Sequence, residues 1–215
     1  HGGRGIMLGP SNYLARKFES VPISVTVEGA NILTRSLIIF GQGAVRCHPF
    51  VLQELEAARD ENRERGLIDF DRLLFQHIGY AVSNAVRSLV MGLTLSKFTS
   101  VPTSGWISRY YQRVNRYSAS FALTADIAML ILGGELKRKE LLSARLGDVL
   151  SNLYLVSMVL KHYQDQGAPE ADRPLVEWSC RMLFYRTQEQ LHSFLRNFPN
   201  RWVAFALRLL VFPRG

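Results

Sequence analysis

The sequence has few of the residues that mark several classes of protein. Its 215 residues include two cysteines, Cys47 and Cys180, which are too few for a disulfide framework and form no CxxC pair. A reducing compartment is therefore expected. The chain has 16 glycines and 8 prolines, and 47% of its residues are apolar. This composition excludes a disordered, collagen-like or low-complexity chain.

Long apolar runs are also absent. A membrane-spanning helix needs about 20 consecutive apolar residues, whereas the longest candidate, 117–134, is interrupted by Asp126. No basic-then-apolar signal segment opens the chain. These absences predict a soluble, cytoplasmic protein. The apolar stretch 201–212, flanked by Arg196 and Arg214, is nevertheless of the kind that can lie on the inner membrane as a peripheral contact.

Positive charge is in excess, since 26 Lys and Arg against 18 Asp and Glu give a formal charge of +8. Such a balance favours anionic partners in general. The basic residues are spread along the chain, and one zone sets Arg109, Arg113 and Arg116 among tyrosines. Because no zinc spacing or RNA-binding signature accompanies this zone, it indicates a solvated helix face, and no nucleic-acid partner is expected.

Helical periodicity dominates after residue 30. The expected helices span 30–48, 49–65, 69–97, 106–132, 137–164 and 171–197, with a short one after Pro199. Asp69 is the expected N-cap of the 69–97 helix. Short connections between long helices favour antiparallel neighbours, so the fold class is all-α, an antiparallel helical bundle.

Two of these helices have a clear apolar face. In the 137–164 helix the core face would be Leu142, Leu146, Val149, Leu153, Val156 and Leu160. In the 69–97 helix the apolar face would be Leu73, Leu74, Ile78, Val82, Val86, Leu89, Val90 and Leu93.

The first 30 residues differ from the rest. Ser11 is a plausible cap for a short helix through Phe18, and the run 21–27 has the β-branched composition of a strand. A strand here would be isolated in a helical chain.

Several residue pairs invite a chemical interpretation. Glu189 and His192 have the Glu-x-x-His spacing of di-iron bundles, but that chemistry needs two such motifs and further carboxylates, so no metal site is expected. Cys47 and His48 are adjacent and cannot face each other on a helix. His77 and His162 stand singly and indicate packing or surface positions.

Asp126 interrupts an apolar helix, and a buried carboxylate needs partners. Arg113 or Arg116 on a neighbouring turn or helix is the expected partner.

Glu28 is the strongest candidate for catalysis. It lies between apolar β-branched residues and Gly29, just before a long helix. Such surroundings can raise the pKa of a carboxylate toward that of a useful base. An acidic residue at a helix N-terminus, favoured by the helix dipole, explains the same position equally well.

The run Val27-Glu28-Gly29-Ala30-Asn31 resembles the Tyr-Glu-Gly-Thr-Asn/Ser segment of acyl-coenzyme A dehydrogenases. The opening Gly2-Gly3-Arg4-Gly5 is similar to the Gly-Gly-x-Gly that precedes this segment in the family. The strings from Ile39 to Pro49, Ser143 to Asp148 and Asn197 to Arg201 resemble the bacterial long-chain branch of fatty-acid β-oxidation.

This resemblance implies a specific chemistry. A glutamate at the position of Glu28 would remove the α-proton of a medium- or long-chain acyl-coenzyme A, while the β-hydride passes to FAD and a trans-2-enoyl-coenzyme A forms. Its backbone N–H would bind the thioester carbonyl, and Gly29, Ala30 and Asn31 would contact FAD. The implied partners are the acyl-coenzyme A, an electron-transfer flavoprotein or equivalent acceptor, and further copies of the protein.

The sequence also departs from the family. Ala30 replaces the usual Thr and removes a hydroxyl, and Val27 replaces an aromatic residue. The family has helix and turn where propensity favours a strand at 21–27, so a non-strand conformation is expected there.

The chain opens with His-Gly-Gly-Arg-Gly instead of Met, so we expect an excerpt of a longer protein. Residues 1–48 would be the end of the catalytic domain, and 49–215 a helical extension specific to the bacterial branch. The excerpt alone would be inactive. A different class of function is open too: a non-catalytic helical module for interaction or peripheral membrane contact.

Overall fold

The computed structural model describes residues 9–10, 13–27 and 34–214, and within these residues it contains helices and no strand. A π-helix, η2, spans Thr34–Gln42, and a 3-10 helix, η3, spans Glu170–Asp172. The α-helices are α1 (Tyr13–Val27), α3 (Gly43–Arg46), α4 (Val51–Ala57), α5 (Arg63–Leu93), α6 (Ser108–Leu132), α7 (Glu135–Arg138), α8 (Glu140–Asp165), α9 (Arg173–Asn197) and α10 (Arg201–Val211).

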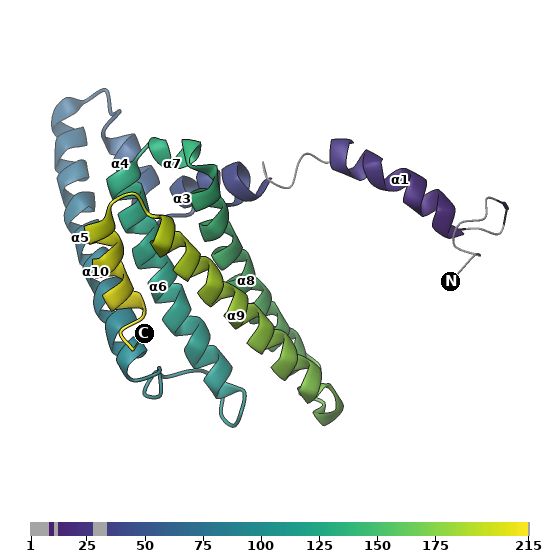
Figure 1. Ribbon diagram of the computed structural model, residues 1–215. Helices are drawn as coiled ribbons and strands as arrows, with labels where there is room; N and C mark the ends of the chain where they lie inside the picture. Colours follow the sequence, from purple (N-terminus) through teal and green to yellow (C-terminus); the bar gives the residue numbers. More distant parts are fainter. Residues whose placement is uncertain (1–8, 11–12, 28–33, 215) are drawn as a thin grey trace.

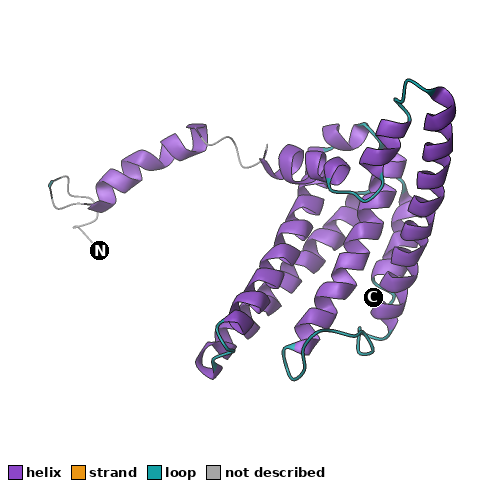
Figure 2. Ribbon diagram, turned by 180° about the vertical axis from the view of Figure 1, so that it is seen from behind, coloured by secondary structure: helices purple, strands orange, loops and turns teal. Residues whose placement is uncertain are grey.

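The four long helices α5, α6, α8 and α9 run up and down beside one another, and α10 returns along the bundle next to α5 (Figure 1). Seen from behind, the connecting loops lie at the two ends of the bundle (Figure 2). This arrangement confirms the expected all-α antiparallel helical bundle. None of the described helices has the length and apolarity needed to cross a bilayer.

The core forms mainly along α8. Its predicted core face is confirmed, because Leu146, Val149, Val156 and Leu160 are fully buried and Leu142 and Leu153 nearly so. Phe184, Leu191 and Phe194 of α9 pack into the same cluster. Burying each such side chain stabilises the fold by about 1.5–3 kcal/mol, so the α8–α9 contact is the main source of stability in the bundle.

The apolar face predicted on α5 does not enter this core. Leu73 is buried, but Ile78, Val82 and Val86 remain about half exposed. The helix instead turns small and polar residues toward α6 and α10, including Ser88, whose Oγ lies 2.8 Å from Ser120 Oγ. Gly92 permits the close approach, since a Cβ there would lie 2.6 Å from Pro213.

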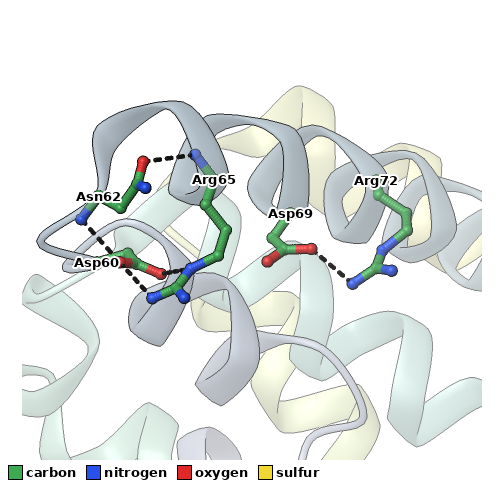
Figure 3. A network of polar contacts seen from close by, with 5 residues as sticks. All are labelled: Asp60, Asn62, Arg65, Asp69 and Arg72. Carbon is green, nitrogen blue, oxygen red and sulfur yellow. Dashed lines mark hydrogen bonds and ion pairs between the residues drawn. The ribbon is translucent and has the colours of Figure 1, made fainter.

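The start of α5 also differs from the prediction. Asn62, and not Asp69, is the N-cap, and its side chain accepts a hydrogen bond from the Arg65 backbone N–H at 3.1 Å. Asp60 supports this turn by pairing with the Arg65 guanidinium at 2.8 Å (Figure 3). Asp69 lies inside the helix and pairs with Arg72. The helix begins before the predicted position because Asn62 offers a better-placed cap acceptor.

The N-terminal predictions have mixed outcomes. Residues 21–27 are helical, within α1, so the non-strand expectation is confirmed and the propensity-based strand is wrong. The helix expected over 30–48 is divided: η2 and α3 cover 34–46, and 28–33 lie outside the described residues. The proposed cap Ser11 also lies outside them. Helix α1 lies away from the bundle (Figure 1).

Candidate functional site

The four residues predicted to carry the chemistry, Glu28, Gly29, Ala30 and Asn31, lie outside the described residues. The chain from Thr34 onward is described, and the contacts that attach it to the bundle are given below.

Helix η2 is fastened to α8 by an ion pair. Arg35 Nη2 donates to Asp148 Oδ2 at 2.8 Å, and Arg35 Nε lies 2.6 Å from Asp148 Oδ1 without the geometry of a hydrogen bond. A hydrogen bond between two charged groups is stronger than one between neutral groups. Ser36, which is buried, adds a hydrogen bond from its Oγ to the Glu140 carbonyl at 3.5 Å.

Gly147 makes the approach of η2 to α8 possible. A Cβ at this position would lie 2.7 Å from the carbonyl oxygen of Arg35, closer than real Cβ contacts. Phe40 completes the attachment, because its buried ring packs edge-on against Phe121 of α6 at 6.4 Å between centroids. The chain a few residues after Glu28 is therefore held against α8 and α6 by charge, backbone contact and apolar packing.

Asp126 is buried, as expected, but its predicted arginine partners are wrong. His48 Nε2 lies 2.8 Å from Asp126 Oδ1. Arg113 instead lies over the ring of Phe184, and Arg116 lies over Tyr117 and donates to the Val211 carbonyl. The two arginines lie over a ring of α9 and a ring of α6, whereas His48 reaches Asp126 from the loop before α4.

His77 and the pair Glu189 and His192 have separate surroundings. His77 Nδ1 lies 2.9 Å from Glu54 Oε1 of α4. Glu189 accepts a hydrogen bond from the Tyr185 hydroxyl, and His192 stacks on Phe212. Burial lowers the pKa of His192, and the nearby Arg208 and Arg196 lower it further. Glu189 and His192 therefore have protein partners that differ from those of a di-iron motif.

A basic hollow lies beside His192. It has a volume of about 580 Å³, and Arg116, Arg196, Arg208 and Arg214 line it together with Glu189 as an acidic residue. Among the described residues, these four arginines form no ion pair. The lining of the hollow therefore has more basic than acidic side chains, which favours anionic partners.

The fold and the attachment of η2 define a helical bundle that holds an N-terminal segment against its central helices. The chain belongs to the family described as acyl-CoA dehydrogenase, C-terminal, bacterial type, whose model matches residues 45–215. This confirms the resemblance to the bacterial acyl-coenzyme A dehydrogenases, a family of oxidoreductases. No solved structure matches the chain.

Sequence reasoning missed the contacts that build this site. Gly147 and Asp148 lie within the string 143–148 that resembles the family, whereas Arg35 lies between the similar runs 27–31 and 39–49. Neither run predicts that Arg35 pairs with Asp148. As a candidate for chemistry, His48 was considered only beside Cys47, and its contact with Asp126 was not predicted. The sequence feature that marks His48 is its position directly before Pro49, where a loop leads into a helix.

Proposed function

We propose that this chain is part of a flavin-dependent acyl-coenzyme A dehydrogenase that oxidises medium- or long-chain acyl-coenzyme A to trans-2-enoyl-coenzyme A in fatty-acid β-oxidation. The family match over 45–215 carries the proposal. The attachment of η2 supports it, because the bundle holds the chain that follows Glu28 through Arg35 and Asp148. In this proposal residues 1–48 end the catalytic domain and 49–215 form the helical extension.

Glu28 is the proposed base. The α-proton of a thioester is weakly acidic, so its removal needs a positioned carboxylate and donors for the enolate-like charge. The backbone N–H of Glu28 would supply one such donor. Bound FAD would accept the β-hydride, and Gly29, Ala30 and Asn31 would contact it. These residues lie outside the described part of the chain, so their fit to a flavin is part of what the experiment tests.

The partners follow from the same proposal. An electron-transfer flavoprotein or equivalent acceptor would reoxidise the flavin, and the protein would form homo-oligomers in the cytoplasm. The 215-residue chain alone would not oxidise acyl-coenzyme A, because it would lack most of the flavin and acyl-chain sites.

Replacing Glu28 by Gln in the full-length protein tests the assignment. The change keeps shape and removes the base, so flavin reduction by acyl-coenzyme A should fall by at least about 10²-fold, the usual contribution of a general base. FAD content, read from the flavin spectrum, should stay unchanged. Glu19→Gln is the control variant, because it replaces an exposed glutamate of α1. Its flavin should be reduced by acyl-coenzyme A at the same rate as that of the unchanged protein. Equal rates in Glu28→Gln and the original protein would remove Glu28 from the mechanism.

A second candidate function, contact with an anionic membrane surface, rests on α10. This helix is apolar on two faces: Ala204, Leu207 and Val211 face the bundle, while Trp202, Phe205 and Leu209 are exposed. Trp202 is 84% exposed. Arg201 and Arg208 flank the exposed face, and the basic hollow adjoins it. Exposed aromatic residues beside arginines suit the boundary between lipid headgroups and acyl chains.

A further inference from the structure

Four ionisable side chains meet where the loop before α4 joins α5 and α6. They are His48 of the loop, Glu54 of α4, His77 of α5 and Asp126 of α6, and together they form what we call the His77–Asp126 cluster. A ring nitrogen of His48, a ring nitrogen of His77 and a carboxylate oxygen of Asp126 all lie within 4.8 Å of one another. Neither the proposed reaction nor the attachment of η2 uses these residues.

The hydrogen bonds of His48 fix its protonation pattern. Its Nδ1 accepts from the backbone N–H groups of Phe50 and Val51, each at 3.1 Å, and so caps the start of α4. A nitrogen that accepts two hydrogen bonds carries no proton, so the proton is on Nε2 and is donated to Asp126 Oδ1. His48 is therefore neutral and has no lone pair left for a ligand.

Asp126 has one oxygen without a partner. Its side chain is 6% exposed, and among the described residues no group donates a hydrogen bond to Oδ2. Leaving a buried carboxylate oxygen unpaired is costly. Because His48 donates a hydrogen bond to Oδ1, the direction of Oδ2 is fixed, and Oδ2 is an acceptor available to a positively charged partner.

His77 is oriented in a complementary way. Glu54 Oε1 lies 2.9 Å from His77 Nδ1, and an ionised carboxylate can only accept, so Nδ1 donates to Glu54 and Nε2 is the nitrogen that a neutral imidazole offers to a ligand. The ring of Phe50 stacks on His77 at 5.6 Å between centroids and fixes its plane. A carboxylate that accepts from one imidazole nitrogen while the other is free is the usual support for a metal-binding histidine.

We propose that the His77–Asp126 cluster binds a divalent transition-metal ion, with His77 Nε2 and Asp126 Oδ2 as protein ligands and water completing the coordination. His48 and Glu54 are positioning residues that act through Asp126 and His77. Two carboxyl groups, those of Glu54 and Asp126, lie in the cluster, and carboxylate oxygen atoms are common ligands of divalent metal ions. Mixed nitrogen and oxygen ligands favour zinc, cobalt or nickel over magnesium or calcium.

The cluster is wider than a metal-bound set of ligands. Metal–ligand bonds near 2.0–2.2 Å place neighbouring ligand atoms about 3–4 Å apart. One polar atom from each of His48, His77 and Asp126 lies within 4.8 Å of the others, so the side chains of the cluster must move closer together, by on the order of 1 Å, when a metal binds. His77, at the edge of the cluster with a side chain 20% exposed, can make this movement and leaves one side open to solvent for bound water.

Cobalt titration of the intact, tag-free protein tests the proposal. After removal of metals with EDTA, added Co²⁺ should produce a visible difference spectrum that saturates at one ion per chain, and Zn²⁺ should displace it. His77→Gln and Asp126→Asn should lose this spectrum. The amide oxygen that Asp126→Asn introduces can still accept from His48, so that variant should keep its fold, as measured by circular dichroism. His48→Gln should weaken Co²⁺ binding and shift the spectrum, which a purely structural role would not do.

A matched control separates this site from adventitious binding. His162 is exposed on α8, and His162→Gln should keep the full Co²⁺ spectrum. The proposal is wrong if the original protein shows no saturable spectrum, or if His77→Gln and His162→Gln bind alike. The Co²⁺ spectrum and the circular dichroism do not depend on flavin reduction. A negative result for the metal site would therefore leave the proposed function unaffected.

Discussion

Cys180 shows how burial alone sets the chemistry of a single residue. The thiol is fully buried in the core between α6, α8 and α9, and this burial raises its pKa to about 12 even though Arg113 opposes the shift. Cys47 is exposed on the loop before α4. The two cysteines of the chain are therefore chemically unlike, and Cys180 is a packing residue.

We predict that iodoacetamide at pH 8 modifies Cys47 quickly and Cys180 only after unfolding, since the reactive thiolate is absent from the core. Mass spectrometry of labelled peptides, with and without urea, measures this. Labelling of Cys180 in the native protein as fast as that of Cys47 would contradict the prediction.

The raised pKa of Cys180 also has a consequence for stability. Above the ordinary thiol pKa of 9.0 the unfolded chain loses this proton first, so the contribution of the group to stability falls as the pH rises toward 12. Urea denaturation across this pH range measures the fall. Cys180→Ser removes the titrating thiol and should make the decline less steep, and an unchanged pH dependence in that variant would contradict the assignment.

The buried carboxylate of Asp126 shows what a sequence can reveal at this scale. Its burial was expected, because apolar residues surround Asp126 on a helix of the bundle. Its partner was not, because His48 lies 78 residues away and nothing in the local pattern marks it. The arginines close to Asp126 in sequence lie over aromatic rings instead.

Among the elements, α5 and α8 illustrate the limits of periodicity. Both have a regular apolar face, and in α8 that face is the core. In α5 the predicted apolar face is largely exposed, with Val82 58% exposed, while Ser88 and Gly92 face the bundle. Periodicity predicts that a helix has two unlike faces, but the neighbours decide which face is covered. Small residues on α5 allow closer approach to α6 and α10 than its large residues would.

The N-cap of α5 gives a test at the same scale. Asn62→Ala should lower the free energy of unfolding by about 1 kcal/mol, because the Arg65 N–H loses its acceptor. Asp69→Ala, at the position that sequence reasoning favoured, should change it by less than about 0.5 kcal/mol, since this is an exposed pair with Arg72. Urea denaturation of the two variants measures the difference, and equal losses would contradict the assignment of the cap.

At the scale of the whole molecule, the class of fold and the family were predictable, and the site was predictable only in part. Short connections and apolar faces indicated the antiparallel bundle, and strings of matching residues indicated the family. The attachment of η2 was not predictable, because the contact of Arg35 with Gly147 and Asp148 depends on how η2 and α8 cross in space.

The outer face of α10 carries a prediction for the whole molecule. The full-length protein should sediment with vesicles of anionic lipid and not with neutral ones, and added salt should release it, since arginine–headgroup attraction is screened. Trp202→Ser with Phe205→Ser should abolish sedimentation. Trp178→Ser on α9, which removes another exposed tryptophan, should not. Binding that survives the α10 double change, or loss in both variants, would exclude this helix as the contact.

The pairing of Arg35 with Asp148 has a consequence for how the protein acquires its structure during synthesis. The two residues are separated by 113 positions, so the contact closes a very long loop, and such contacts form late. While the ribosome adds the intervening residues, η2 has no α8 on which to dock. Helix η2 therefore reaches its place on the bundle only after translation has passed Asp148, and a chain terminated before that residue would leave η2 unanchored.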